Sequence, residues 1–161
     1  MHAENIHALS LAEQGELGEI DFTRITISTS CNSEIKKEEI IKENLSFVRS
    51  LHQNQIKSLY ASSNAEETVF LISLQFLNDS LSNIFLDFTF SDSDSYIKKF
   101  EISGSDGIYE YHSGQHSAFY SNFLISGPYD PCFYSSVLDN IWLDELLQSI
   151  KQSSKQNILM K

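Results

Sequence analysis

The histidines and cysteines are the residues of this chain best suited to proton transfer, nucleophilic attack or metal binding. His112 and His116 stand four positions apart, a spacing that suits a metal ion when both imidazoles lie on one face of a helix. Gly114 lies between them and disfavours a helix, so we expect two surface-loop histidines. Cys31 and Cys132 form no Cys-x-x-Cys pair, so no metal site is predicted. Two reduced thiols are favoured over one disulfide.

Carboxylates and tyrosines could serve two further kinds of chemistry. Asp87 alternates with Phe85 and Thr89, so it is either an inward carboxylate or, as we favour, a residue on a partly solvated face. The C-terminal third is rich in tyrosines, which could stack on a sugar but are better explained by sheet packing and an interface. These are Tyr109, Tyr111, Tyr120, Tyr129 and Tyr134. A triad of His112, Asp139 and a serine has nothing to position it, so no catalytic residue is assigned.

The elements that must position these residues follow from hydrophobic periodicity. Helices are predicted at residues 3–14, 34–52 and 137–152, and strands at 19–29, 56–61, 68–77, 84–90, 96–103, 108–111 and 118–125. In the longest helix the apolar residues Ile41, Leu45 and Val48 recur at helical spacing. The last residues, 153–161, are expected to fray. Successive hairpin-like strands between helices predict an α+β fold, with a largely antiparallel sheet and helices packed on one face.

Composition bounds the class of protein. The 161 residues fit one domain spanning positions 1–161. Acidic residues outnumber basic ones by 22 to 11 and no Lys/Arg cluster is present, so nucleic acid and anionic membranes are not expected as partners. No apolar run of about 18 residues suggests a transmembrane helix. The N-terminus does not resemble a signal peptide, so a cytoplasmic location is expected.

The predicted strand at 68–77 carries apolar residues on both faces. One face presents Phe70 and Ile72, and the other presents Val69, Leu71 and Leu77. A sheet with one solvated face would alternate more cleanly between apolar and polar residues. We therefore expect that helices cover one face and that the other is an interface, formed with a second copy of the chain or with another domain.

Two glycine-containing segments resemble a known family. Residues 9–20 read LSLAEQGELGEI and precede a strand, and residues 100–111 read FEISGSDGIYEY. Gly15 and Gly18 can end a helix with positive φ, and Gly104 and Gly107 can form a tight turn between strands. Together they resemble the C-terminal domain of the glucose–fructose oxidoreductase/inositol dehydrogenase (Gfo/Idh/MocA) family. The segment 144–150 resembles the closing helix of that domain.

The resemblance implies two domains with different roles, of which this chain would be only one. Complete family members bind NAD or NADP on an N-terminal Rossmann domain, and the C-terminal sheet domain supplies a substrate wall and most of the oligomer interface. This sequence contains no Gly-x-Gly-x-x-Gly, and no residue is assigned to cofactor binding. No cofactor is therefore expected in this chain alone. The expected partners are further copies of the chain and a Rossmann domain encoded separately.

The resemblance also implies where a substrate would lie. Family enzymes carry a histidine and an acidic residue on the first long helix of this domain, where the histidine acts as a base. The matching helix here has no histidine at that position, and Lys42 or Glu43 stands nearest to it. His52 ends the helix. The substrate-wall candidates are the end of the first strand with its following loop, and this histidine: Ser28, Thr29, Ser30, Asn32 and His52.

Three functions follow as hypotheses. The leading one is a stand-alone or truncated C-terminal domain of an NAD(P)-dependent oxidoreductase, which serves oligomerisation and substrate-side binding and is not catalytic alone. The second is a non-enzymatic scaffold that uses the same sheet for protein–protein contact. The third, an independent enzyme with its site among the tyrosines, has the least support, and substituting Tyr109 and Tyr111 with Phe would test it.

Overall fold

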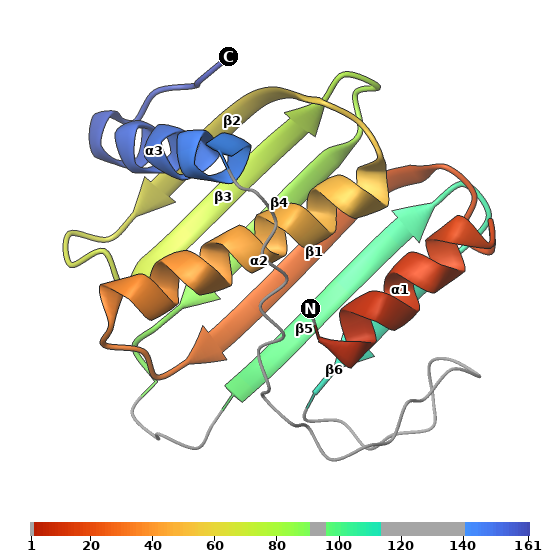
Figure 1. The fold of residues 1–161 in the computed structure, drawn as a ribbon, viewed down its shortest axis with the longest axis horizontal. Coiled ribbons are helices and arrows are strands. Elements are labelled where there is room, and N and C mark those ends of the chain that lie inside the picture. The colour runs from red at the N-terminus through yellow and green to blue at the C-terminus, as the bar shows by residue number, and fades with distance from the viewer. Residues whose placement is uncertain (1, 91–95, 114–140) are drawn as a thin grey trace.

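Three helices and six strands make up the part of the chain that the computed structural model describes, residues 2–90, 96–113 and 141–161. Their order is α1 (Ala3–Glu13), β1 (Ile20–Thr29), α2 (Glu34–His52), β2 (Ile56–Ser63), β3 (Val69–Phe76), β4 (Leu81–Asp87), β5 (Tyr96–Gly104), β6 (Ile108–His112) and α3 (Ile141–Gln156). All three helices lie on one face of a single sheet (Figure 1). The α+β prediction is therefore confirmed.

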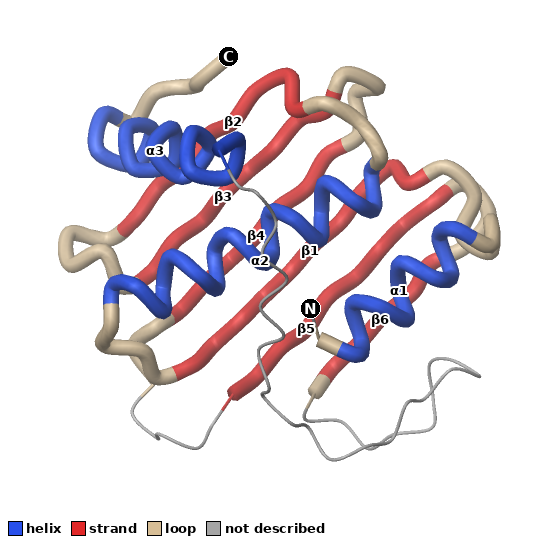
Figure 2. The backbone as a smooth tube through the Cα atoms, in the orientation of Figure 1, coloured by secondary structure: helices blue, strands red, loops and turns tan. Residues whose placement is uncertain are grey.

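Strand β1 lies inside the sheet, whose order is β2-β3-β4-β1-β5-β6 (Figure 2). It pairs parallel with β4 and antiparallel with β5, and the remaining neighbours pair antiparallel. The parallel pair has a simple origin. Helix α2 carries the chain back, so that β2 runs in the same direction as β1. The hairpins β2–β3 and β3–β4 each reverse the chain, so β4 again runs in that direction and is parallel to β1. The sheet is thus largely antiparallel, as predicted.

The core lies between the helices and one face of the sheet. Every second residue of β1, namely Thr23, Ile25 and Ile27, is buried against α2, which contributes Leu45 and Val48 from its predicted stripe. These side chains are at most 1% exposed. Residues that recur every second position along the strand and every 3.6 positions along the helix therefore pack together in one apolar layer.

Two sequence predictions were wrong in their limits. Strand β4 begins at Leu81, three residues before the predicted start, because its polar Ser82 and Asn83 were taken for a loop although Ser82 is fully buried. The predicted frayed tail is ordered instead. Helix α3 continues to Gln156, and Met160 then pairs with Leu59 of β2 through two backbone hydrogen bonds of 2.8 and 2.9 Å.

Helix α1 ends in a glycine turn. The amide of Gly15 bonds to the carbonyl of Ala12, and the amide of Glu16 reaches back to Leu11 at 3.0 Å. This is the Schellman arrangement, which requires a left-handed residue, and Gly15 has φ +77°. Gly18 follows with φ +68° and leads the chain into β1.

The segment between α1 and β1 crosses directly over the turn between β5 and β6. The amide of Ser105 donates to Glu19 at 2.9 Å, and the amide of Asp106 donates to Leu17 at 3.1 Å. The crossing is close enough that a Cβ placed on Gly104 would lie 2.1 Å from the carbonyl oxygen of Leu17. The two glycine segments singled out in the sequence therefore contact each other.

This crossing predicts a sharp contrast between two glycines of one turn. Gly104→Ala should lower the free energy of unfolding by about 3 kcal/mol or more, because the atom it meets is backbone and cannot rotate away. Gly107→Ala is the matched control, since its Cβ would find no atom nearer than 3.7 Å, and it should change stability by less than about 1 kcal/mol. Denaturant unfolding of both variants measures the difference. Equal losses would contradict the close crossing.

Candidate functional site

The predicted substrate wall lies at the carboxyl end of β1. Ser28 and Thr29 are the last residues of the strand, and both are half-buried. Ser30 forms an isolated antiparallel bridge with Thr89, and Asn32 is exposed. Short hydroxyl and amide side chains therefore gather here beside the end of β4, where Asp87 accepts hydrogen bonds from the backbone and hydroxyl of Thr89.

His52 lies elsewhere, buried at the end of α2 beside the β3–β4 hairpin and the first half of β1. Its ring stacks on Phe76 with centroids 4.2 Å apart. Nδ1 lies 2.8 Å from the hydroxyl of Ser80, and Nε2 lies 3.0 Å from that of Thr23. Because Ser80 donates its only proton to Asn78, Nδ1 of His52 must be the donor toward Ser80, and Nε2 accepts from Thr23. Burial lowers the pKa of His52 to about 4, so the ring is neutral near pH 7.

The structure does not bring all five wall candidates together. His52 contacts Thr23, which precedes Ser28 by five residues, or about 16 Å along a strand. The four residues at the end of β1 form one group, and His52 joins α2 to the β3–β4 hairpin instead. A substrate role for either remains a prediction.

A buried charged cluster that was not predicted from the sequence joins α1 to the sheet. The ammonium of Lys98 on β5 is 3.0 Å from the carboxylate of Glu4 and 2.6 Å from the amide oxygen of Asn5. The Lys98 side chain is 1% exposed and lies 5.6 Å from the ring centre of Phe100. Burial lowers the pKa of Lys98, and the carboxylates of Glu4 and Glu43 counteract part of that effect.

Glu43, on the helix where the family carries its histidine, belongs to the same cluster. Its carboxylate lies 3.4 Å from Nε2 of His2. Burial opposes ionisation of Glu43, but the hydrogen bond with His2 and the charges of His2 and Lys98 outweigh it and hold its pKa below the usual value. The cluster therefore fixes α1 against both α2 and β5.

Not every polar atom of this cluster has a partner. Among the described residues of the cluster, the amide nitrogen of Asn5 and one carboxylate oxygen of Glu43 are buried without a hydrogen bond. The sequence held one signal of the cluster. Lys98 and Lys99 are adjacent on a strand, so alternation must turn one of them toward the core.

The tyrosines that the structure describes pack within the sheet domain. Tyr109 is 5% exposed, and Tyr111 stacks on Phe100 with centroids 5.1 Å apart. Burial and the charge of Glu4 raise the pKa of each to about 12. The other predictions for the C-terminal third concern residues outside the described ones: Tyr120, Tyr129, Tyr134, His116, Cys132, Asp139 and the strand at 118–125.

The face of the sheet opposite the helices carries an apolar patch, here called the open-face patch and formed by Phe22, Leu71, Leu81 and Phe85. Leu71 pairs directly with Phe85 across β3 and β4, and Leu81 pairs with Phe22 across β4 and β1. Leu71, Leu81 and Phe85 are 41, 46 and 37% exposed. None of the three described helices covers this face (Figure 1). A polar row separates the two apolar pairs: Ser73 pairs with Asn83, Asn83 with Arg24, and Arg24 with Glu101.

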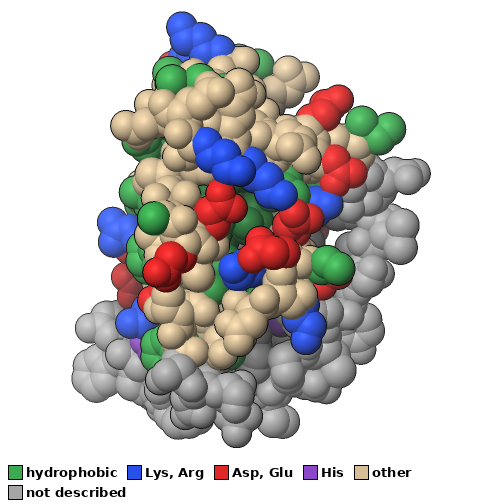
Figure 3. All heavy atoms as spheres, turned by 90° about the vertical axis from the view of Figure 1, so that its left-hand side faces the viewer, with side chains coloured by type: hydrophobic (Ala, Val, Ile, Leu, Met, Phe, Trp, Pro, Cys, Tyr) green, Lys and Arg blue, Asp and Glu red, His purple; other side chains and the backbone are tan. Residues whose placement is uncertain are grey.

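Charges elsewhere on the described surface are mixed. Figure 3 shows acidic and basic side chains interspersed on one side of the molecule. Ion pairs such as Lys151–Glu38 at 2.5 Å and Lys155–Glu67 at 3.5 Å account for part of this mixing. In the described segments, no three His, Cys, Asp or Glu side chains gather as metal ligands, and none of the helices has the length and apolar character needed to cross a membrane.

Comparison with known proteins gives matches among solved structures. No family model and no curated protein matches the chain. A myo-inositol dehydrogenase from Corynebacterium glutamicum superposes with a TM-score of 0.72 at 13% identity, over 99% of this chain and 61% of its own. GenD2 from gentamicin A biosynthesis, solved with NAD, gives a TM-score of 0.69 at 13% identity, over 99 and 60%. A scyllo-inositol dehydrogenase from Lactobacillus casei, solved with NAD(H) and scyllo-inositol, gives 0.53 at 13%, over 68 and 38%.

These likenesses establish the fold. The chain has the sheet-and-helix fold found in part of these dehydrogenases, so the predicted resemblance to the Gfo/Idh/MocA oxidoreductases is confirmed at the level of the fold. It spans about 60% of the length of the first two structures.

The buried neutral His52 predicts a specific pH dependence of stability. Its pKa of about 4 lies below the ordinary 6.5, so the unfolded chain binds the proton first as pH falls below 6.5. The free energy of unfolding should therefore fall by about 2 kcal/mol between pH 6.5 and 5 on account of this residue. In His52→Gln that part of the slope should vanish. Urea titrations of both proteins at several pH values measure it, and identical slopes would contradict the buried ring.

The Lys98 cluster predicts a contrast between two adjacent lysines. Lys98→Met should lower the free energy of unfolding by about 3 to 5 kcal/mol, because it leaves the Glu4 carboxylate buried without its ion-pair partner. Adding Glu4→Gln should recover part of that loss. Lys99→Met is the control, since Lys99 is exposed, and it should stay within about 0.5 kcal/mol of the wild type. Similar losses for the two single variants, measured by guanidinium unfolding, would show that Lys98 is not buried as described.

Proposed function

We propose that this chain is the sheet domain of a two-domain dehydrogenase, in which it forms the oligomer interface and one wall of the substrate site. The observation that carries the proposal is the superposition on a dehydrogenase with a TM-score of 0.72, over 99% of this chain but only 61% of the other. Proteins of this fold include one solved with NAD(H) and an inositol, so a polyol-like substrate and NAD or NADP are the natural candidates for the complete enzyme.

In this proposal the chain is not catalytic alone. Hydride transfer requires a dinucleotide held by its phosphates, usually on a glycine-rich turn between a strand and a helix. The sequence has no Gly-x-Gly-x-x-Gly, so a Rossmann domain, wherever it is encoded, would supply NAD or NADP. The chain would contribute the polar end of β1, Ser28 to Asn32, as the wall that contacts substrate hydroxyls.

The open-face patch supports the role in oligomerisation. Three of its four side chains are more than a third exposed, and they form two apolar cross-strand pairs, Leu71 with Phe85 and Leu81 with Phe22. Two such sheets can pack face to face at about 10 Å, with their apolar side chains interdigitated. The Ser73–Asn83 and Arg24–Glu101 pairs lie in the row between the two apolar pairs, so they would be buried in that contact and would need polar partners across it.

The alternative is a scaffold that keeps the sheet only for protein–protein contact, and the same open-face patch favours it. Mixing the chain with a separately encoded Rossmann-domain protein distinguishes the two functions. Formation of NADH from NAD and a polyol in the mixture, and in neither protein alone, would exclude the scaffold. A complex without such activity would favour it.

The oligomer proposal predicts the effect of one charge in the open-face patch. The wild-type chain should be a dimer or a larger assembly by light scattering. Leu71→Glu should shift it toward the monomer, because the carboxylate would be buried at the contact. Ile35→Glu is the matched control, since Ile35 is 71% exposed on α2 and lies away from the sheet.

Two outcomes would contradict this prediction. One is a wild-type chain that stays monomeric as its concentration rises. The other is an assembly that Leu71→Glu leaves intact. Circular dichroism of both variants should match the wild type, because each substitution replaces a side chain that is already exposed.

A further inference from the structure

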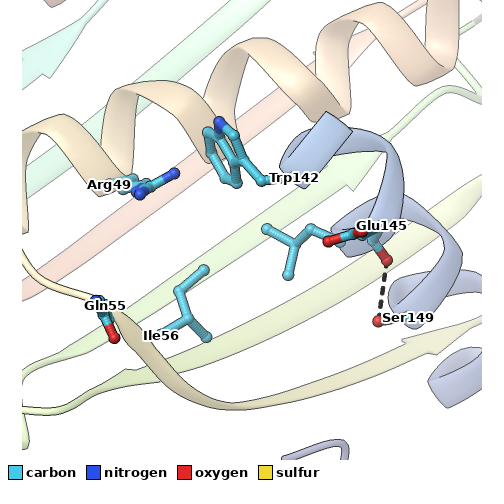
Figure 4. Close-up of a pocket in the computed structure, with 7 residues that line it drawn as sticks. Arg49, Gln55, Ile56, Trp142, Glu145 and Ser149 are labelled. Atoms are coloured by element: carbon cyan, nitrogen blue, oxygen red, sulfur yellow. Dashed lines mark hydrogen bonds between the residues drawn. The ribbon is translucent and has the colours of Figure 1, made fainter. Parts of the chain in front are cut away.

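A pocket lies where the end of α2, the start of β2 and the first turns of α3 meet. Its volume is about 270 Å³. The lining combines an arginine and an aromatic ring with a carboxylate, two further polar side chains and two aliphatic ones: Arg49, Trp142, Glu145, Gln55, Ser149, Ile56 and Leu146. Figure 4 shows Arg49 and Trp142 close together on one side, with Ile56 and Glu145 across from them. Arg49, Gln55 and Glu145 are exposed, whereas Ile56, Trp142 and Leu146 are half-buried.

Arg49 is a cation that stacks on an aromatic ring and has no ion pair among the described residues. The chain has twice as many acidic as basic side chains, 22 against 11, so carboxylates are abundant. Lys42, Lys57 and Lys151 each lie within 2.7 Å of one. Arg49 forms no ion pair with any described residue, and its guanidinium lies 4.2 Å from the ring centre of Trp142. The contact with the ring holds the guanidinium in place and leaves its in-plane N–H donors for another acceptor.

The remaining residues limit which acceptor fits. A guanidinium recognises carboxylates and phosphates through paired N–H donors. Glu145 lines the same pocket and would repel a dianion such as phosphate, so a single negative charge is favoured. The Glu145 carboxylate and the Gln55 amide oxygen are acceptors, so they select a ligand that also donates hydrogen bonds. Ile56 and Leu146 offer contact to a short carbon skeleton, and the volume lies just below the usual range for small-molecule sites.

We propose that this pocket binds a small organic monocarboxylate that also carries a hydroxyl or ammonium group. The carboxylate would accept two hydrogen bonds from Arg49, and the donor group would face Glu145 and Gln55. The inference does not depend on the proposed function. The substrate-wall residues precede the first turn of α2, and Arg49 lies 15 residues beyond its start at Glu34, about 22 Å along the helix axis.

The sequence supplies both a reporter and a control for this site. Trp142 is the only tryptophan of the chain, so tryptophan fluorescence reports on this pocket alone. Arg24 is the only other arginine, and it lies on the open face of the sheet beside Glu101. Arg49→Gln and Arg24→Gln therefore make the same chemical change at the pocket and away from it.

The experiment is a titration of the whole chain with lactate, glycerate and serine through the millimolar range, followed by Trp142 fluorescence. We expect a saturable change with at least one of them, weakened about tenfold or more in Arg49→Gln and unchanged in Arg24→Gln. Lactamide, which has no charge, should not produce the change. Circular dichroism establishes that both variants are folded, and the indole N–H signal of Trp142 in NMR spectra provides a second measure of binding.

Three results would overturn the proposal. The first is the absence of a saturable change with every hydroxy- and aminocarboxylate tested. The second is binding that Arg49→Gln leaves as strong as in the wild type. The third is binding of lactamide or inorganic phosphate with the same affinity as the carboxylates, which would show that the pocket does not select a single negative charge with a donor group.

Discussion

The fold depends on the crossing between the segment that enters β1 and the turn that joins β5 to β6. The two backbones approach so closely at Leu17 and Gly104 that no side chain fits between them. Backbone hydrogen bonds from Ser105 and Asp106 then fix the height at which β1 enters the sheet. Because β1 is central and pairs on both sides, this one crossing sets the register of β5 directly and, through β1, that of β4. A one-residue slip of β1 would exchange its buried and exposed faces.

Polar contacts, more than apolar ones, determine where the helices lie on this sheet. Apolar packing is tolerant of small shifts, whereas a buried charge or imidazole has few acceptable partners. Lys98 ties α1 to β5 through Glu4 and Asn5, and His52 ties the end of α2 to β1 and to the β3–β4 hairpin. Helix α3 follows the same rule in a milder form, since the buried hydroxyl of Ser153 accepts from the amide of Ala61 on β2. Each helix therefore has one polar contact that specifies its position.

Much of the fold followed from the sequence, and the gaps have physical reasons. Alternation and helical spacing identified the order of the described elements, and the two glycine segments identified the family fold. What periodicity could not supply were contacts between residues far apart in sequence. Nothing in the sequence indicated the partners of Lys98 on α1. Residues 153–161 were expected to fray because the contacts of Ser153 and Met160 with β2 join residues far apart in sequence. The candidate site was divided for the same reason, since nothing in the order of residues shows that His52 is turned toward Thr23.

The position of β1 also governs how this chain can fold. The strand is near the start of the sequence, yet its partners come much later: Phe22 pairs with Leu81, and Ile25 pairs with Phe100. Non-local pairing of this kind raises contact order and slows folding, because the entropy of closing long loops is lost before the contacts that compensate for it can form. The β2–β3–β4 meander has only short connections and can assemble early. During synthesis on the ribosome, β1 therefore stays unpaired at both edges, with its apolar residues exposed, until β4 and β5 have been made. A strand in this state is a site for chaperone binding and for aggregation.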